Sequence, residues 1–579
     1  MSIHNGVGVR VWNVSLVVTM MALVVTMTVL ASACGQSDVD TAPPVAMLAP
    51  DIPVSVTGGD IVGALAEGSP NIVTFKGVPY AAPPVGDLRW KPPEPVVGWD
   101  GVRDATAPGP ICMQTGPAQM RSPMASDDDP ESEDCLSLNI WAPTEAQEPL
   151  PVMVWVHGGG FFNGAGSLPI YDGAGVAERG VVLVTINYRV GIFGFFAHPA
   201  LSAESPHGAS GNYGLMDMVA ALEWVRDNIA TFGGDPNQVT LFGNSAGGGA
   251  VMSVMLVPQS EGLFHRAISE STWVYGWDRQ LSEPVGAWDS AEAQGVQIAE
   301  SLGASGEMAL DQDLEMMRAA TSMDVQEAGD ASGMDLLRRT GYLWAPNVDG
   351  WIIPSDPFGM YEAGLQHDVP LITGMNADEG AGPALRANIE DPDSFESYVR
   401  TVYPGVADEM IAEYDVTSSE KAKSQIAHLI GDMLFAGPVR VQVEAHAQVA
   451  SPVWLYHFTR VPPTALGAAL GVSYHGAEVA YVFDTMTAGS GASGPPHPMA
   501  TDGEWTETDR QLSETMMAYW TQFAATGNPN RDDLPAWPAY DQSTDQHLNL
   551  GETVTSGEGL HHAGGRLFRS FEMSRRAER

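Results

Sequence analysis

Apolar segments separated by a helical pattern are the feature that most constrains how this chain folds. Residues 151–156, 181–186 and 239–242 are nearly continuous apolar runs, and residues 217–229 between the last two carry apolar side chains at helical spacing. Strands that are apolar on both faces and alternate with helices indicate a mostly parallel sheet that is covered on both sides. We therefore predict an α/β fold, with polar chemistry at the carboxyl ends of the strands.

A serine stands on the turn after the third apolar run. Residues 243–247 read Gly-Asn-Ser-Ala-Gly, and residues 248–252 read as the start of a helix. A serine on such a strand–turn–helix has an exposed hydroxyl, and the flanking glycines relieve crowding of the strained backbone. The five-residue pattern alone arises by chance in Gly-rich chains, but its context favours Ser245 as a nucleophile.

A run of glycines follows the first apolar strand. Residues 157–161 read His-Gly-Gly-Gly-Phe. Attack on a carbonyl carbon creates an oxyanion, which needs preorganised N–H donors about 3 Å away. Consecutive glycines let backbone N–H groups approach without a side-chain clash. We expect Gly159, Gly160 and the amide of Ala246 to be these donors; a plain tight turn is the alternative.

A serine nucleophile needs a general base and an acid that orients this base. The chain has 14 histidines, so spacing alone does not select one. His475 follows an apolar stretch, and Glu379 follows the strand-like residues 370–374, in the order acid then base that this class of fold uses. From the residues alone, ordinary surface or core positions are the alternative for both.

The composition restricts the partners of this protein. Apolar residues make up 44% of the chain, which is ample for a buried core, and the formal net charge is −44 at pH 7. Because phosphate binding requires a basic surface, we exclude nucleic acid as a partner.

Residues 1–33 are predicted to be an export signal. Residues 11–30 are almost wholly apolar, Arg10 is the only charge before them, and small residues follow. Leu-Ala-Ser-Ala-Cys at 30–34 resembles the lipobox of bacterial lipoproteins, which predicts lipidation of Cys34 and a membrane-anchored protein on the periplasmic or extracellular side. Ordinary cleavage, which gives a secreted protein, and an uncleaved anchor are the alternatives.

The rest of the chain is predicted to be a tether and one catalytic domain. Residues 34–52 are polar, acidic and Pro-containing, whereas residues 53–575 show neither a second linker nor a repeat. Three cysteines in an exported chain leave one unpaired. A pair of Cys112 with Cys135 leaves Cys34 for lipidation, and two free buried thiols are the alternative.

Further segments carry a family resemblance. They read Phe-Lys-Gly-Val-Pro-Tyr-Ala (75–81), Glu-Asp-Cys-Leu (133–136), Leu-Asn-Ile-Trp (138–141), Gly-Asn-Tyr-Gly-Leu-Met-Asp (211–217), Phe-Gly-Gly-Asp-Pro (232–236), Trp-Thr-Gln-Phe (520–523) and Thr-Gly-Asn-Pro-Asn (526–530). Together with the two glycine-rich turns, these segments resemble the type-B carboxylesterase and cholinesterase family of α/β-hydrolases. The resemblance covers the chain from about residue 54 onward.

The resemblance implies both the fold and the catalytic residues. The fold is the α/β-hydrolase fold, a large mostly parallel central sheet flanked by helices, with loop and helical insertions that form a gorge. A Ser-Glu-His triad is implied, in which Glu379 matches the second acidic position of the family's Asp-Glu-Gly and His475 the first of its His-Gly-x-Glu. The oxyanion-hole donors that match are Gly159, Gly160 and Ala246, and the family's first disulfide matches Cys112 and Cys135. No metal or cofactor is implied.

Two departures narrow what the resemblance implies. Family members usually have Glu before the nucleophile, and Asn244 here predicts a lower pKa for His475 than in a Glu-bearing relative. Cholinesterases place a choline-stacking Trp between the residues that match Cys112 and Cys135, where this chain has none. Residues 380–383 also read Gly-Ala-Gly-Pro where cholinesterases have aromatics. Without cation–π partners for choline, general esters are the expected substrates.

The sequence thus predicts a serine carboxylesterase that acts on small-molecule esters. Trp273, Tyr342 and Trp344 are expected to line the pocket, with wall packing remote from the ester as the alternative for the last two. The functional alternative is a lipase, or a specialised hydrolase of esters, carbamates or toxins, of the same family. A non-catalytic surface adhesion protein is the remote alternative, and the oligomeric state is left open.

Overall fold

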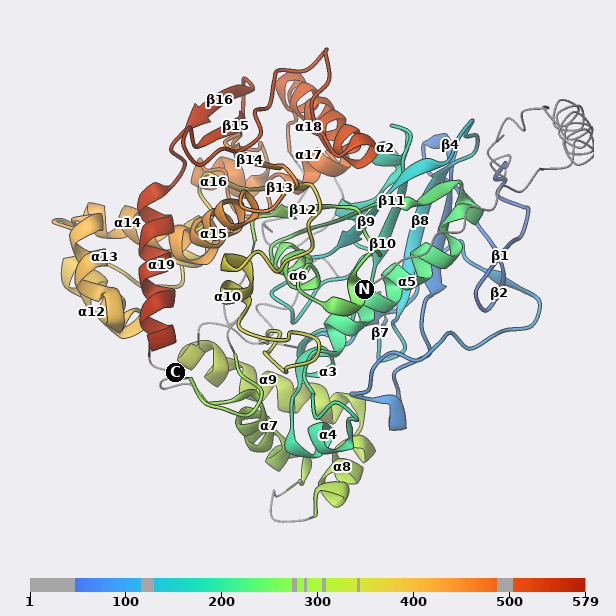
Figure 1. Ribbon diagram of the computed structural model, residues 1–579, viewed down its shortest axis with the longest axis horizontal. Coiled ribbons are helices and arrows are strands. Elements are labelled where there is room, and N and C mark those ends of the chain that lie inside the picture. The colour runs from blue at the N-terminus through green and yellow to red at the C-terminus, as the bar shows by residue number, and fades with distance from the viewer. Residues whose placement is uncertain are drawn as a thin grey trace, which may run out of the picture. The chain divides into compact units, whose positions relative to one another are not determined.

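The computed structural model describes residues 47–115, 130–272, 279–285, 289–304, 309–340, 344–486 and 503–577. Its centre is an 11-stranded sheet (Figure 1). In spatial order the strands are β16 (Thr555–Glu558), β15 (Gln546–Leu550), β14 (Val453–Phe458), β13 (Leu371–Asn376), β12 (Arg266–Glu270), β11 (Gly234–Asn244), β9 (Leu150–Val156), β10 (Val182–Ile186), β8 (Ser137–Pro143), β4 (Ser69–Pro79) and β3 (Ala64–Ala66).

Most of this sheet is parallel. The strands from β15 through β10 pair in parallel, whereas β8, β4 and β3 at one end and β16 at the other pair antiparallel. The predicted α/β fold is confirmed. The edge strands β3 and β16 escape a search for apolar runs because they are short. Strand β16, which reads Thr-Ser-Gly-Glu, is also polar and mostly exposed.

Helices surround the sheet (Figure 1). They are α2 (Ala174–Ala177), α3 (Gly191–Phe195), α4 (Pro199–Glu204), α5 (Tyr213–Asn228), α6 (Ala246–Val254), α7 (Ala291–Ala299), α8 (Leu310–Ala319), α9 (Ser322–Thr340), α10 (Pro357–Glu362), α11 (Ala381–Ala384), α12 (Pro392–Val402), α13 (Ala407–Tyr414), α14 (Ser419–Gly431), a π-helix η7 (Asp432–Ala436), α15 (Gly437–His446), α16 (Ala465–Leu470), α17 (Val479–Phe483), α18 (Glu507–Thr526) and α19 (His562–Ala577).

Strand β9 shows how both faces of the sheet are buried. Its residues Val152, Val154 and Val156 belong to one hydrophobic core together with residues of α5 and α6. Met153 and Trp155 point the other way and belong to a second core with residues of α17 and α18. Because successive strand residues face opposite sides, a strand covered on both faces has to be apolar throughout. This is why the run at 151–156 shows no alternation.

A third hydrophobic core is helical. It is formed mainly by α10, α12, α13, α14, α15 and α19, which lie to one side of the sheet (Figure 1). Two small sheets complete the described structure: β1 (Val54–Val56) with β2 (Gly59–Val62) and β5 (Val102–Asp104), and β6 (Ile111–Cys112) with β7 (Glu131–Ser132).

The predicted export signal and Cys34 lie outside the described residues. Across the ranges that the structure does describe, no helix combines the length and the apolar character that a bilayer crossing needs. The export signal, the tether and the boundaries of the catalytic domain therefore stay predictions.

Candidate active site

Ser245 occupies a strained turn between β11 and α6. Its backbone has φ 61° and ψ −123°, and the residue is 8% exposed. The flanking glycines are required by close packing, because a Cβ on Gly243 would lie 2.5 Å, and one on Gly247 2.1 Å, from the carbonyl oxygen of Val156. Ser245 N–H donates to the carbonyl oxygen of Glu270 at the end of β12, 2.9 Å away. The expected strand–turn–helix is confirmed.

The glycine run packs directly against this turn. A Cβ on Gly158 would lie 2.8 Å from the carbonyl oxygen of Asn244 and 3.1 Å from Cβ of Ser245. Gly159 and Gly160 have φ values of 115° and 63°, which side chains disfavour. Within the described residues, the N–H groups of Gly159, Gly160 and Ala246 donate to no acceptor. These three N–H groups are therefore available to an acceptor from outside the chain, and Gly158, next to Gly159, packs against Ser245.

His157, the residue before the glycine run, is held in place by Tyr188. Its ring stacks on Tyr188, with centroids 4.3 Å apart, and its carbonyl oxygen accepts a hydrogen bond of 2.9 Å from the Tyr188 hydroxyl. Burial lowers the pKa of His157 to about 4, although a hydrogen bond with the Gly158 carbonyl opposes this shift. His157 is therefore neutral at physiological pH, and its contacts are structural.

Glu379 and His475 are hydrogen-bonded to each other. His475 donates from Nδ1 to Oε2 of Glu379 over 2.6 Å, and the backbone N–H of Asn376 donates to Oε1 over 2.7 Å. The His475 side chain is 26% exposed and that of Glu379 is 3% exposed. Burial opposes the protonated imidazole, but the charge and hydrogen bond of Glu379, and further the charge of Glu478, raise the pKa of His475 above its usual value.

Glu478 connects the three loops that carry Ser245, Glu379 and His475. It is fully buried, and it accepts hydrogen bonds from the side-chain amides of Asn244 on Oε1 and Asn376 on Oε2. The orientation of the Asn376 amide follows from its second bond, since Nδ2 also donates 2.8 Å to the carbonyl oxygen of Tyr474. Two donors favour the ionised carboxylate.

The buried network contains a second carboxyl group. Glu270 is fully buried at the end of β12, where Oε1 accepts a hydrogen bond of 2.7 Å from Nε1 of Trp520. Burial and then the charge of Glu478 raise the pKa of Glu270 well above its usual value. Burial and then the charge of Glu379 raise that of Glu478 as well. Because Glu478 has the amide donors, the ionised form is favoured at Glu478 over Glu270.

Sequence reasoning missed Glu270, Asn376 and Glu478 as parts of the site. Glu478 was visible as the last residue of His-Gly-Ala-Glu, three positions after His475. No pattern in the sequence, however, shows that its carboxylate meets Asn244, which lies 234 positions away.

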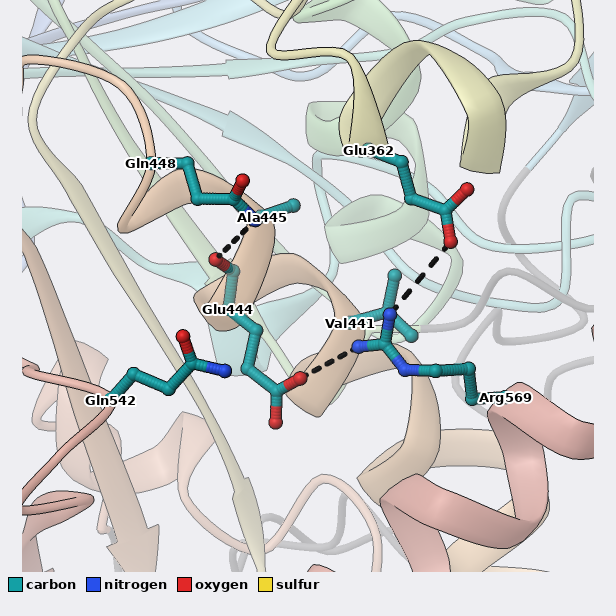
Figure 2. A pocket seen from close by; sticks show the side chains of 7 residues that line it. All are labelled: Glu362, Val441, Glu444, Ala445, Gln448, Gln542 and Arg569. Atoms are coloured by element: carbon teal, nitrogen blue, oxygen red, sulfur yellow. Dashed lines mark hydrogen bonds and ion pairs between the residues drawn. The ribbon is translucent and has the colours of Figure 1, made fainter.

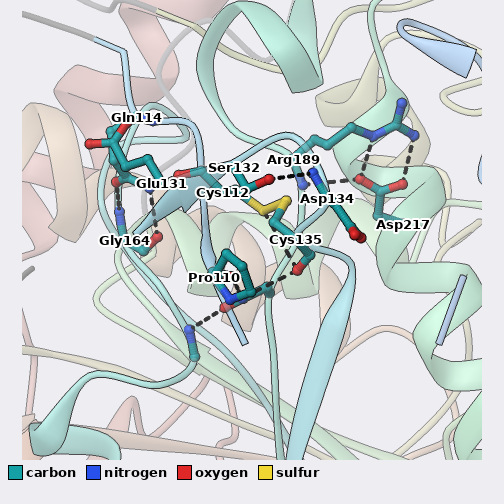
Figure 3. Close-up of a disulfide and its surroundings, with 12 residues drawn as sticks. Pro110, Cys112, Gln114, Glu131, Ser132, Asp134, Cys135, Gly164, Arg189 and Asp217 are labelled. Carbon is teal, nitrogen blue, oxygen red and sulfur yellow. Dashed lines mark hydrogen bonds and ion pairs between the residues drawn. A yellow bond between two sulfur atoms is a disulfide. The ribbon is translucent and has the colours of Figure 1, made fainter. Parts of the chain in front are cut away.

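The predicted disulfide between Cys112 and Cys135 is confirmed, with the two Cα atoms 4.9 Å apart (Figure 3). It lies beside the glycine run. Gln114, two residues after Cys112, accepts a hydrogen bond of 2.6 Å from Gly164 N–H, and Thr115 N–H donates 2.9 Å to the carbonyl oxygen of Phe162. The cross-link therefore anchors the segment that holds the glycine run in place.

The three predicted pocket residues stay predictions, because nothing in the described structure tests them. Trp344 is 1% exposed and belongs to the main hydrophobic core. Trp273 and Tyr342 lie outside the described residues.

A cavity of about 250 Å³ lies elsewhere, between α10, α15 and α19 (Figure 2). Arg569 contacts both Glu444, at 2.6 Å, and Glu362, at 3.7 Å, and Arg440 and Arg576 pair with the same two carboxylates, so both carboxylates have cationic partners. The residues that line this cavity include no catalytic nucleophile; they are Glu362, Val441, Glu444, Ala445, Gln448, Gln542 and Arg569. This cavity is therefore not the site of ester chemistry.

Known proteins are similar to this chain over most of its length. A family model described as "Carboxylesterase family" matches residues 50–564. The chain is 36% identical to "Fumonisin B1 esterase" of Sphingopyxis macrogoltabida, over 86% of this chain and 87% of that protein. It is 34% identical to "Para-nitrobenzyl esterase" of Bacillus subtilis (strain 168), over 87% and 95%. A solved structure titled "PNB ESTERASE" aligns with a TM-score of 0.72 and 31% identity, over 89% of this chain and 99% of that one.

Proposed function

This chain belongs to the carboxylesterase family and is a carboxylic ester hydrolase, and we propose that it acts through an acyl-enzyme on Ser245. The observation that carries the proposal is the 2.6 Å hydrogen bond from His475 Nδ1 to Glu379. Because Nδ1 is engaged, Nε2 is the basic nitrogen that remains for a serine hydroxyl. The exposed hydroxyl expected of a serine on a strained turn supports Ser245 as its partner.

In the first half-reaction, His475 Nε2 accepts the hydroxyl proton while Ser245 Oγ attacks the ester carbonyl carbon. The carbonyl oxygen becomes an oxyanion between the N–H groups of Gly159, Gly160 and Ala246. Each such donor contributes about 3 kcal/mol of transition-state stabilisation. The tetrahedral intermediate then collapses, the bond to the alcohol oxygen breaks, and His475 returns its proton to the leaving alcohol.

In the second half-reaction, water takes the place of the alcohol. His475 removes a proton from water, the hydroxide oxygen attacks the acyl carbon, and the bond to Ser245 Oγ breaks as the proton returns to the serine. Glu379 keeps the imidazole in one tautomer throughout and stabilises the imidazolium in both half-reactions. This mechanism needs no metal ion or cofactor.

The test is the variant Ser245→Ala, with Ser253→Ala as its control. Ser253 lies in α6, the helix that follows Ser245, and its hydroxyl donates 2.8 Å to the carbonyl oxygen of Gly249. We expect Ser245→Ala to lose at least about 10⁴-fold in kcat on p-nitrophenyl acetate, and Ser253→Ala to keep nearly full activity. A fluorophosphonate should label Ser245 in the wild type, as shown by peptide mass spectrometry. Substantial turnover by Ser245→Ala would refute the mechanism.

We propose general carboxylic esters as the substrates. The carboxylesterase family and the similarity to a para-nitrobenzyl esterase support general esters, whereas the similarity to a fumonisin B1 esterase supports the specialised alternative. A panel of p-nitrophenyl esters of increasing acyl length, with fumonisin B1 added, separates the two. A short-chain optimum indicates a general carboxylesterase, a long-chain optimum a lipase, and a far higher kcat/KM on fumonisin B1 a specialised hydrolase.

Export and lipidation at Cys34 complete the proposal. The Cys112–Cys135 disulfide supports an oxidising compartment outside the cytoplasm. Mass spectrometry of the mature protein tests the prediction: a chain that begins at an acylated Cys34 supports the lipoprotein. An unmodified N-terminus at or near the same residue indicates a secreted form.

A further inference from the structure

A π-helix stands next to the candidate site. Residues Asp432–Ala436 form this π-helix η7 between α14 and α15. Such wide turns are rare and often occur at functional sites. Its residue Phe435 is 1% exposed, and its ring lies 4.3 Å, centroid to centroid, from the imidazole of His475 at an interplanar angle of 33°. The π-helix therefore places a phenyl ring over one face of the His475 imidazole.

This contact restrains a motion that Glu379 alone leaves open. The hydrogen bond to Glu379 fixes the Nδ1 edge of His475. It does not fix the plane of the imidazole, because the ring can still tilt about that bond. The phenyl ring of Phe435 restrains the tilt, since a tilted imidazole loses the contact between the two faces. With one edge and one face restrained, Nε2 keeps a single direction.

The π-helix is itself held by neighbouring elements. The buried carboxylate of Asp432 accepts 2.7 Å from the Tyr414 hydroxyl and 2.8 Å from Nδ1 of His561. On its far side, a Cβ on Gly437 would lie 2.3 Å from Cβ of Phe568 in α19. Contacts with α13, with His561 and with α19 therefore fix the position of the π-helix and of Phe435 within it.

The same helical segment also packs on the loop that carries Glu379. A Cβ on Gly431, the residue before the π-helix, would lie 3.1 Å from the backbone nitrogen of Gly380 and 3.7 Å from Cβ of Glu379. One continuous segment thus contacts both Glu379 and His475, so the relative position of acid and base depends on it.

We propose that Phe435 is a positioning residue for His475. Its ring holds the imidazole with Nε2 toward Ser245, and its aromatic face stabilises the imidazolium that forms during acyl transfer. The π-helix Asp432–Ala436 sets the place of this ring. The inference rests on the proposed role of His475 as general base.

The test compares Phe435→Leu with Phe264→Leu. Phe264 is also buried against a histidine, His367, with centroids 5.7 Å apart, but that pair lies outside the site. We expect Phe435→Leu to lower kcat about two- to thirtyfold, the rate equivalent of one cation–π contact, with little change in KM. Phe264→Leu is expected to lower Tm without changing kcat or the pH profile.

The pH dependence supplies a readout that a purely structural role does not move. The carboxylates that face His475 are Glu379 and Glu478, and neither changes in Phe435→Leu. Loss of the aromatic face therefore shifts the acid limb of the profile of kcat/KM against pH downward by roughly half a unit to one and a half units. Phe435→Tyr keeps the face, so we expect it to keep the wild-type acid limb.

Two outcomes overturn the inference. One is a folded Phe435→Leu with wild-type kcat and an unmoved acid limb; if this variant does not fold, Phe435→Met is assessed by the same criterion. The other is an equal loss of activity in Phe264→Leu, which would show a general effect of core packing. Failure of the proposed function looks different, because Ser245→Ala and His475→Ala would then retain activity.

Discussion

On the Ser245 side of the candidate site the backbone does the positioning, whereas on the His475 side buried side chains do it. The strained turn at Ser245 and the glycines 158 and 159 pack closely against main-chain atoms, which leave no space for a Cβ. His475 instead depends on Glu379 and Phe435, which come from two other segments of the chain. The hydrogen bond from Asn244 to Glu478 links the two halves.

The two kinds of construction are expected to respond differently to substitution. A tightly packed backbone turn has no space for an added methyl group. Such a group therefore displaces the backbone together with its N–H donors. A network of side chains loses one contact at a time and keeps the others. A single substitution on the Ser245 side should therefore cause a large loss of activity. Substitutions on the His475 side should each cause a smaller loss.

Among the variants that test this contrast, the largest effect is expected from Gly159→Ala. The Cβ of alanine would lie 2.2 Å from the carbonyl oxygen of Asn163, at a φ of 115° that alanine disfavours. The glycine run has to shift, and its N–H groups then miss the oxyanion. We expect kcat to fall by about 10² to 10³-fold or more on p-nitrophenyl acetate while circular dichroism still shows a folded protein.

Gly208→Ala is the matched control for this variant. Gly208 also has a positive φ, 64°, but nothing lies within 4 Å of its Cβ position. Backbone strain alone costs about 1 kcal/mol of stability there, so kcat is expected to be unchanged. Wild-type kcat in Gly159→Ala would show that this glycine does not hold an oxyanion donor.

The same contrast explains what the sequence reveals. Backbone constructions are written in consecutive residues: the strand at 151–156 with its glycines, and the turn at Ser245, are both visible as local patterns. Side-chain networks join distant residues, and nothing local marks Asn376 or Phe435 as neighbours of the base. Glu379 and His475 were selected through family resemblance rather than spacing, since 14 histidines compete for the role. The edge strand β16 was missed because it is short and polar.

A smaller effect is expected when the disulfide is removed by the double variant Cys112→Ser/Cys135→Ser. The cross-link spans 23 positions and stabilises the fold by about 3 kcal/mol. Gln114 and Thr115 keep their hydrogen bonds to the segment of the glycine run. We therefore expect Tm to fall by a few degrees, with kcat at low temperature within about threefold of wild type. A kcat loss as large as that of Gly159→Ala would mean that the disulfide itself positions the oxyanion donors.

The smallest effect is expected from Asn244→Glu, which alters the link between the two halves. A second carboxyl group beside Glu478 would raise the pKa of His475 if it were fully ionised, and the acid limb of kcat/KM would move to higher pH. Glu478, however, already accepts a hydrogen bond from Asn244. Two buried carboxyl groups in contact share one proton, which cancels most of the added charge. We expect an upward shift of less than about one unit.

The shared proton also predicts how the stability of Asn244→Glu depends on pH. The carboxyl pair would bind its proton more tightly in the folded than in the unfolded state, so its folded pKa is the higher one. Below the unfolded pKa this pair causes no loss, and stability falls as pH rises toward the folded pKa. Denaturant unfolding at pH 5, 7 and 9 should show a steeper decline in Asn244→Glu than in wild type or in the uncharged control Asn244→Gln. Parallel curves for all three would mean that residue 244 and Glu478 do not share a proton, and the full charge would then have to appear as a larger shift of the acid limb.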